Sequence, residues 1–344
     1  MRTSPDQQRR HPLLAGVAAF NALSAGLGAV SLIIGWLTLG ATVTGRLPFA
    51  SAAVGGIALG VIVALPNALL TVVVLRRDSR SGPLAIVAGI LLVGWIVVEL
   101  AFIREFSFFH PFYTTIGLLQ VALGLRIVRA STGITGRELL REVVDVLVDL
   151  PVFLTSPLYR RWHLTWGATQ EESLAPMLGD ERIQRPAYRS TRAITVQASP
   201  EQVWPWLVQV GCQRAGFYSD DLLDNLGRPS SRILVPELQQ LELGQLVPMS
   251  PQPTETTSFK VAAYDAPHEL LWTTPDSTWS WRLVEESPGR TRMVTRIRAV
   301  HDWSRPAMGL LSLVLLEFGD FAMLRRMLRG IKERAENSPR DNDP

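Results

Sequence analysis

Four long apolar segments within the first 125 residues constrain most strongly what this chain can fold into. They are residues 13–39, 48–75, 83–103 and 106–125, and only the third contains a residue that is charged at neutral pH, Glu99. A helix of about 20 apolar residues crosses the ~30 Å hydrocarbon layer of a membrane. The first segment is too long for the core of a cleaved signal peptide, which is the alternative for an N-terminal apolar run. The sequence therefore predicts an α-helical membrane domain of four transmembrane helices, residues 12–130, after a cytoplasmic tail, residues 1–11.

The arginines around these segments predict how the chain crosses the membrane. Three lie in the N-terminal tail and three in the loop after the second segment, whereas the other two loops carry one each: Arg2, Arg9 and Arg10; Arg76, Arg77 and Arg80; Arg46; and Arg104. Positive residues stay on the cytoplasmic side, so we expect a multi-pass protein with cytoplasmic N- and C-termini. Lys260 and Lys332 are the only lysines, which is typical of a GC-rich genome and favours the inner membrane of a bacterial cell.

Composition excludes several classes of function. The single cysteine, Cys212, excludes an internal disulfide and a cysteine-based zinc cluster. The sequence contains no glycine-rich phosphate loop and no HExxH pattern, so we expect neither cofactor nor metal. The arginines gather at the edges of apolar segments rather than on one basic surface, and we therefore expect no nucleic-acid partner.

Glu99 is the first candidate for chemistry. An ionisable side chain in an apolar segment indicates a functional site by default. Gln120, on the fourth segment, is its candidate partner within the membrane. The structural alternative is that Glu99 pairs with Arg104 in the hydrated region at the end of the third segment.

Residues 131–184 are predicted to be a juxtamembrane helix and a linker. Residues 135–150 begin with a capping-box pattern, Thr135 with Glu138, and continue with an apolar stripe at helical spacing. This helix either packs on the following domain or lies on the membrane surface. Residues 159–167, YRRWHLTWG, are typical of the lipid headgroup region, or else their tryptophans dock the linker onto the domain. His163 is a weak candidate for a catalytic base, since no nucleophile motif accompanies it.

Residues 191–211, TRAITVQASPEQVWPWLVQVG, predict a strand, a turn and a helix. Polar and apolar residues alternate up to Ala198, as in a half-buried strand. Ser199 is a suitable N-cap, Pro200 suits the first helical position, and Gln202 completes a capping box.

This stretch resembles the opening of the START-like (SRPBCC) superfamily of polyketide cyclase/dehydrase-like proteins. The similarity continues in Arg214-Ala-Gly-Phe-Tyr-Ser and Val235-Pro-Glu-Leu-Gln and covers roughly residues 188–335. It implies an α+β helix-grip fold, in which a curved antiparallel sheet wraps around a long C-terminal helix and leaves an apolar cavity between them. We therefore expect a START-like domain at residues 185–336 and a disordered tail at residues 337–344.

Strands are predicted at residues 259–264, 270–274, 278–285 and 290–300, with a bent edge segment at residues 246–253. In the hairpin, Trp279, Trp281 and Leu283 share one face, which we assign to the interior. The opposite face carries arginines, which we assign to water: Arg292, Arg296 and Arg298. The apolar run at residues 307–328 contains Glu317 and Asp320, which would be costly inside a membrane, and so predicts the long C-terminal helix rather than a fifth span.

The predicted cavity lies between the sheet and this helix. Its expected lining is Trp204, Tyr218, Trp279, Trp281, Leu283, Leu310, Leu313, Glu317 and Phe321. A buried Glu317 would act as an acid or as a hydrogen-bond donor to a ligand carbonyl. The structural alternative is an ion pair of Glu317 or Asp320 with Arg282 or Arg214.

We expect a membrane-anchored protein that binds a hydrophobic small molecule or lipid in this cavity. One alternative is a cyclase- or dehydrase-type enzyme acting on a membrane-derived substrate, which would need an acid and a base facing one cavity. The sequence offers only four residues for these roles, and they are scattered along the chain: Glu317, Asp320, His268 and His301. No catalytic set is therefore predicted. The other alternative is a non-catalytic scaffold with a closed core.

Overall fold

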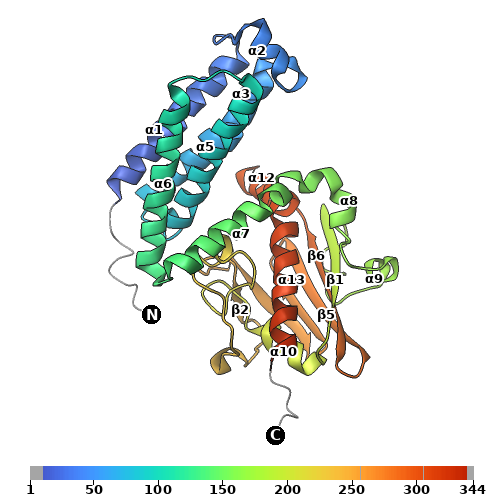
Figure 1. The fold of residues 1–344 in the computed structure, drawn as a ribbon. Coiled ribbons are helices and arrows are strands. Elements are labelled where there is room, and N and C mark those ends of the chain that lie inside the picture. The colour runs from blue at the N-terminus through green and yellow to red at the C-terminus, as the bar shows by residue number, and fades with distance from the viewer. Residues whose placement is uncertain (1–10, 256, 305, 339–344) are drawn as a thin grey trace. The chain divides into compact units, whose positions relative to one another are not determined.

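The computed structural model describes residues 11–255, 257–304 and 306–338. The predicted cytoplasmic tail, apart from His11, and the end of the predicted disordered tail lie outside these residues. The chain divides into two compact units, Met1–Leu139 and Leu140–Pro344, and each is described by itself below (Figure 1).

The first unit is helical. Among the described residues, four helices are long and apolar enough to cross a membrane, as the sequence predicted: α1 (Pro12–Ile33), a continuous helix over Ala52–Leu75, α5 (Ser81–Ile103) and α6 (Phe109–Thr132). The second of these consists of α3 (Ala52–Leu59), one π-helical turn η3 (Gly60–Ala64) and α4 (Leu65–Leu75). Pro66 lies at the start of α4, where it removes a backbone donor and suits a π-turn. Two short helices, α2 (Gly40–Arg46) and η2 (Pro48–Ala50), join α1 to α3.

Glycines allow α5 and α6 to pack closely. A Cβ on Gly89 would lie 2.6 Å from the carbonyl oxygen of Gly117, and a Cβ on Gly124 would lie 2.7 Å from that of Gly82. The two glycines of each helix are seven residues apart, and the helices run in opposite directions, so both pairs fall in one seam. Small residues that bring backbones together are the usual means of helix association in a membrane.

The second unit contains a six-stranded antiparallel sheet in the order β1-β6-β5-β4-β3-β2. The strands are β1 (Tyr188–Val196), β2 (Leu246–Pro248), β3 (Ser258–Asp265), β4 (Glu269–Thr273), β5 (Ser277–Ser287) and β6 (Arg290–Ala299). Each predicted strand is present, and the turn between β5 and β6 has Gly289 at a φ of 72°. β1 pairs with β6 along its full length, so the first and last strands are neighbours.

Most helices of this unit lie at the ends of the sheet and across one of its faces (Figure 1). The helices are α7 (Gly136–Thr155), η4 (Ser156–Tyr159), α8 (Arg160–His163), α9 (Gln170–Leu174), α10 (Pro200–Val208), α11 (Asp221–Asp224), η5 (Pro236–Leu238), α12 (Pro306–Val314), η6 (Leu315–Gly319) and α13 (Asp320–Glu336). α13 crosses the sheet and packs on β1 and α10. Ser199 forms the predicted capping box with Gln202 at the start of α10.

One hydrophobic core lies between the sheet and α13. The strand register places Tyr188 opposite Ala299, Trp281 opposite Thr295, and Trp272 opposite Trp279, so all of these side chains share one face of the sheet. This face, which we call the inner face, packs against Leu324, Met327, Leu328 and Ile331 of α13.

The opposite, outer face was predicted wrongly. The sequence assigned its arginines to water, but Arg296 is fully buried and Arg298 is 8% exposed. The predicted linker, residues 168–185, packs over them: α9 and the turns after it lie against β1 and β6, with Met177 in a small cluster beside Ala193 and Val294. A segment without hydrophobic periodicity can still cover a sheet when polar side chains hold it.

Candidate functional site

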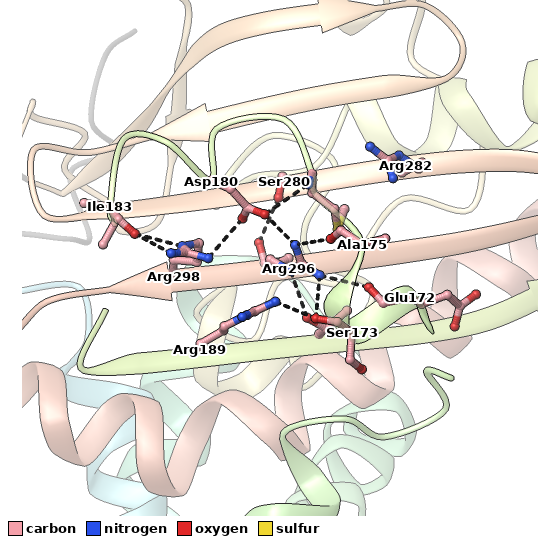
Figure 2. Close-up of polar contacts among 12 residues, drawn as sticks. Glu172, Ser173, Ala175, Asp180, Ile183, Arg189, Ser280, Arg282, Arg296 and Arg298 are labelled. Carbon is pink, nitrogen blue, oxygen red and sulfur yellow. Dashed lines mark hydrogen bonds and ion pairs between the residues drawn. The ribbon is translucent and has the colours of Figure 1, made fainter. Parts of the chain in front are cut away.

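Arg296 and Arg298 of the outer face hold the covering segment, residues 168–185, by hydrogen bonds. The Arg296 guanidinium donates to Asp180, to Thr191, and to three backbone carbonyls (Glu172, Ser173 and Ala175), over 2.6–3.0 Å (Figure 2). Arg298 donates to the carbonyls of Ile183 and Gln184. A guanidinium has five N–H donors, and Arg296 uses all of them. Arg296 and Arg298 therefore make structural contacts with the segment that covers this face.

The inner face differs because several of its buried polar groups have no partner. The indole rings of Trp272, Trp279 and Trp281 form one cluster, with centroids 5.2–5.8 Å apart. Trp279 donates its N–H to Thr295 Oγ1 at 2.9 Å. Trp272 and Trp281 are 0% and 1% exposed, and their indole nitrogens find no acceptor among the described residues. An unmet buried donor costs about 1–3 kcal/mol, so two of them in one core need an explanation.

A polar cluster lies beside the tryptophans, on β1. Arg192 is fully buried and donates to Asp320 of α13 at 2.5 Å, to the carbonyl of His163 at 2.8 Å, and to the Tyr188 hydroxyl at 3.1 Å. Tyr188 donates to Asp320 at 2.7 Å. The register puts Arg192 next to Thr295 and Thr295 next to Trp281, so the cluster and the indoles belong to adjoining strands.

His163 contributes a third buried donor. Its Nδ1 lies 3.4 Å from Arg192 Nη2, which can only donate, so Nδ1 is the acceptor and Nε2 carries the proton. Burial, and next the Arg192 charge, lower the pKa of His163 and keep it neutral. Its Nε2 has no partner within the described residues, and neither has the buried Oγ of Ser190. The inner face is thus lined by apolar rings and by N–H donors.

The structure brings five of the nine predicted cavity residues into this core. Trp279, Trp281 and Leu283 are buried, Tyr218 is 5% exposed, and Trp204 is partly buried against the cluster. The Tyr218 hydroxyl donates to the Trp206 carbonyl and accepts from Gln209, so it has its partners within the protein. Whether these residues bind a ligand stays a prediction.

Three of the four predicted residues of the C-terminal helix lie elsewhere, and Phe321 lies beside Arg192, whose guanidinium carbon is 5.3 Å from its ring centroid. Leu310 is 55% exposed and Leu313 half-buried. Phe321 is buried, but against Tyr159, Trp162, His163 and Trp166. Glu317 pairs with Arg160 at 2.8 Å and Asp320 with Arg192, and Arg282 pairs with Glu269. The ion pairs proposed from the sequence, with Arg282 or Arg214, are therefore wrong.

The polar residues of the first unit also have other partners than predicted. Gln120 is fully buried, accepts from Asn21 at 2.9 Å and donates to Asn67 at 2.7 Å, which ties α1, α4 and α6 together. Glu99 lies near Trp95 and His110. A chain of three buried amide side chains joined by hydrogen bonds is typical of the polar contacts that hold membrane helices together.

A group of acids lies where α7, α11 and α13 meet. Both carboxylate oxygens of Asp220 and of Asp224 are buried and accept no hydrogen bond from the described residues, although Arg326 lies 3.5 Å from Asp220. Burial, together with nearby carboxylates and against the Arg326 charge, raises the pKa of Asp220 to about 6 and that of Glu142 to about 7. No group of three or more His, Cys, Asp or Glu side chains among the described residues has the geometry of a metal site.

Sequence reasoning missed the residues that distinguish the inner face. Trp272 was placed on its strand, but only the pairing of β4 with β5 puts it opposite Trp279. Arg192 and Ser190 stand in a strand that shows no charge pattern, and their burial depends on α13 and α8. The aromatic row of β4 and β5, three tryptophans within residues 272–281, was the available signal.

Comparisons with known proteins add little to this description. No protein-family model matches the chain, and no curated protein matches it. Two solved structures are similar at low levels. A conserved protein of unknown function, EF2215 from Enterococcus faecalis, has 14% identity and a TM-score of 0.25 over 45% of this chain and 77% of its own. CalU16 from Micromonospora echinospora has 17% identity and a TM-score of 0.21 over 43% of this chain and 83% of its own. Similarities of this size define neither a family nor an activity.

Proposed function

We propose that this protein is a membrane-anchored binding protein whose C-terminal unit holds a hydrophobic small molecule or lipid against the inner face of the sheet. The four apolar helices anchor it. The observation that carries the proposal is the pair of buried indole N–H groups, on Trp272 and Trp281, that have no acceptor in the described chain. A bound molecule with carbonyl or ester oxygens would accept from them while its carbon chain contacts the rings.

The buried donors without a partner within the described ranges indicate the chemical class of the ligand. Trp272, Trp281 and His163 all present donors, and the carboxylate nearest them, Asp320, is already bound by Arg192 and Tyr188. A ligand with acceptor oxygens therefore fits better than an amine or a cation. The strands are about 4.8 Å apart, so Ser190 on β1 and Trp272 on β4 are separated by about 14 Å, the length of an extended acyl chain of moderate size.

Photo-crosslinking of the full chain tests this proposal. The chain would be reconstituted in lipid nanodiscs with a long-chain fatty acid that carries a diazirine, and the crosslinked peptides would be mapped. We expect adducts on residues 269–287, distinct from the adducts that any membrane helix acquires. Crosslinks confined to α1–α6 would refute ligand binding and favour the scaffold function.

Three matched variants sharpen the test. All three changes remove the same side-chain volume, but Trp272→Phe and Trp281→Phe remove unmet donors, so they should cost less stability than Trp279→Phe. They should reduce the crosslink yield about five- to tenfold, which corresponds to one hydrogen bond of ~1 kcal/mol or slightly more. Trp279→Phe removes an indole whose donor is used by Thr295, so it should cost about 1 kcal/mol more stability than the other two and leave the polar contacts of the ligand intact. Equal effects of all three would contradict the assignment.

We also infer that both termini are cytoplasmic in a bacterial inner membrane, from the arginine distribution. Reporter fusions after Gly45 and Ser81 check this orientation. A cytoplasmic signal at Gly45 together with an external signal at Ser81 would reverse it.

A further inference from the structure

The C-terminal unit exposes a group of large apolar side chains, which we call the α12 patch. They are between 39% and 85% exposed: Leu158, Trp162, Trp303, Leu310, Val314, Leu315 and Phe318. Single exposed apolar residues are ordinary, whereas a contiguous group on one surface marks an interaction site.

Three segments meet to form this patch. Ser156 of η4 donates to the Glu317 carbonyl of η6 at 2.7 Å, and the Trp162 ring lies 5.5 Å from that of Phe321. A Cβ on Gly309 would lie 2.9 Å from the Trp303 ring, so this indole rests directly on α12. The patch is therefore one surface, although its residues come from three separate parts of the sequence.

Arginines with exposed side chains border the patch. Arg160 is 43% exposed at its side chain, and Arg161 is exposed beside it. Two nearby acids are neutralised by arginines, Glu317 by Arg160 and Asp320 by Arg192, which leaves Arg161 as the exposed positive charge next to Trp162. Tryptophans with apolar side chains and arginines beside them suit the boundary between lipid headgroups and acyl chains.

The link between the two units is short. α6, the fourth apolar helix, ends at Thr132, and α7 begins at Gly136. The four residue steps from Thr132 to Gly136 span at most about 14 Å, and α7 itself is only about 30 Å long, so the second unit cannot leave the vicinity of the bilayer that holds α6.

We propose that the α12 patch inserts into the headgroup region of an anionic membrane surface, the surface of the same membrane that anchors the chain. This inference uses the membrane anchor but not the ligand on the inner face, so the two can fail separately. Insertion would place α12 and η6 against the lipid.

Nitroxide labels on the full chain in nanodiscs test the proposal. One label replaces Leu315 in the patch (Leu315→Cys). A control label replaces Val284 (Val284→Cys), which is 45% exposed and lies outside the patch, about 24 Å along β5 from the first residue of that strand, Ser277. The unchanged chain controls for labelling of Cys212, which is buried. Collisions with oxygen report lipid, and collisions with a water-soluble nickel complex report solvent.

In phosphatidylethanolamine–phosphatidylglycerol nanodiscs we expect the oxygen-to-nickel collision ratio to be several-fold higher at the patch label than at the control label. Arg161→Glu should lower the fraction of chains whose α12 patch is inserted in the lipid at least about fivefold in these discs. The same change should have little effect in phosphatidylcholine discs. Equal ratios at both positions would overturn the proposal. A patch label shielded from both reagents would also overturn it, since that result means that protein, including a second copy of this chain, covers the patch.

Discussion

Replacing Asp320 by asparagine should unfold the C-terminal unit far more easily than any comparable change on its surface. Arg192 is fully buried, and Asp320 is the only carboxylate that pairs with it among the described residues. Asp320→Asn keeps the shape of the side chain and removes the negative charge. Arg192 would then remain buried with only neutral partners, the His163 carbonyl and the Tyr188 hydroxyl.

The expected cost is about 3–5 kcal/mol, since removing one member of a buried ion pair strands the other charge. For a domain of about 200 residues, each kcal/mol lowers the melting temperature by about 2–4 °C, which gives a loss on the order of 10 °C. The variant Arg192→Met together with Asp320→Leu removes both charges and should recover most of this loss.

The single cysteine gives an assay that reports this unit alone. Cys212 is 2% exposed in the native C-terminal unit, and the sequence contains no other thiol. A maleimide dye that fluoresces on reaction therefore becomes bright only when this unit opens. The assay works on the full chain in detergent or in nanodiscs, whatever the apolar helices do at the same temperature.

Glu317 supplies the matched control three residues away on the same helix. It pairs with Arg160, which is 43% exposed at its side chain. Such pairs contribute about 0–1 kcal/mol, so Glu317→Gln should shift the melting temperature by at most a few degrees. Equal shifts for Asp320→Asn and Glu317→Gln, or a double variant no more stable than Asp320→Asn, would refute the reasoning from burial.

Two further predictions concern other parts of the chain. Burial, with the Asp221 and Asp145 carboxylates, raises the pKa of Glu142 to about 7, so its ionised form opposes folding above that pH and the penalty vanishes as the pH falls toward 4.5. Glu142→Gln should therefore stabilise the C-terminal unit at pH 8 by ~1 kcal/mol, after screening by solvent, and should leave its stability at pH 5 unchanged. Thermal unfolding followed by tryptophan fluorescence measures this, and the same gain at both pH values would contradict the prediction. In the first unit, Gly89→Ala should cost about 1–3 kcal/mol because its methyl group meets the Gly117 carbonyl, whereas Gly94→Ala, which meets nothing within 4 Å, should not; equal resistance to unfolding in dodecyl sulfate would show that the helices do not pack there.

The elements with a long apolar run or a regular alternation of polar and apolar residues were predictable from the sequence. The four apolar helices have bounds close to those expected, because twenty uncharged residues allow few other structures. The strands of the C-terminal unit follow from alternation and from the turn before Gly289. The pairing of β1 with β6, which completes the order β1-β6-β5-β4-β3-β2, joins strands far apart in the sequence and was not predicted.

The buried arginines show why alternation fails to locate charged residues. Alternation separates two faces of a strand, but it does not say what covers each face. Arg296 is buried because Asp180 and several backbone carbonyls of residues 172–175 close over it. These acceptors belong to a polar segment with no period, so no pattern in the strand itself could have revealed them. The inner-face donors escaped prediction for the same reason, since an unmet hydrogen bond is a property of the packed core.

The C-terminal helix shows how one turn changes which residues face the sheet. The buried residues of α13, including Phe321, Leu324, Leu328 and Ile331, follow the usual helical spacing. Continued backwards at 3.6 residues per turn, that stripe would include Glu317, Val314 and Leu310, and the sequence placed Glu317 and Leu310 in the cavity lining. The π-turn η6 inserts one extra residue into the helix, so everything before it rotates by about 100° relative to α13. Leu310 and Val314 consequently lie 55% and 44% exposed, and the apolar run that resembled a core helix instead forms the surface for which we propose a membrane contact.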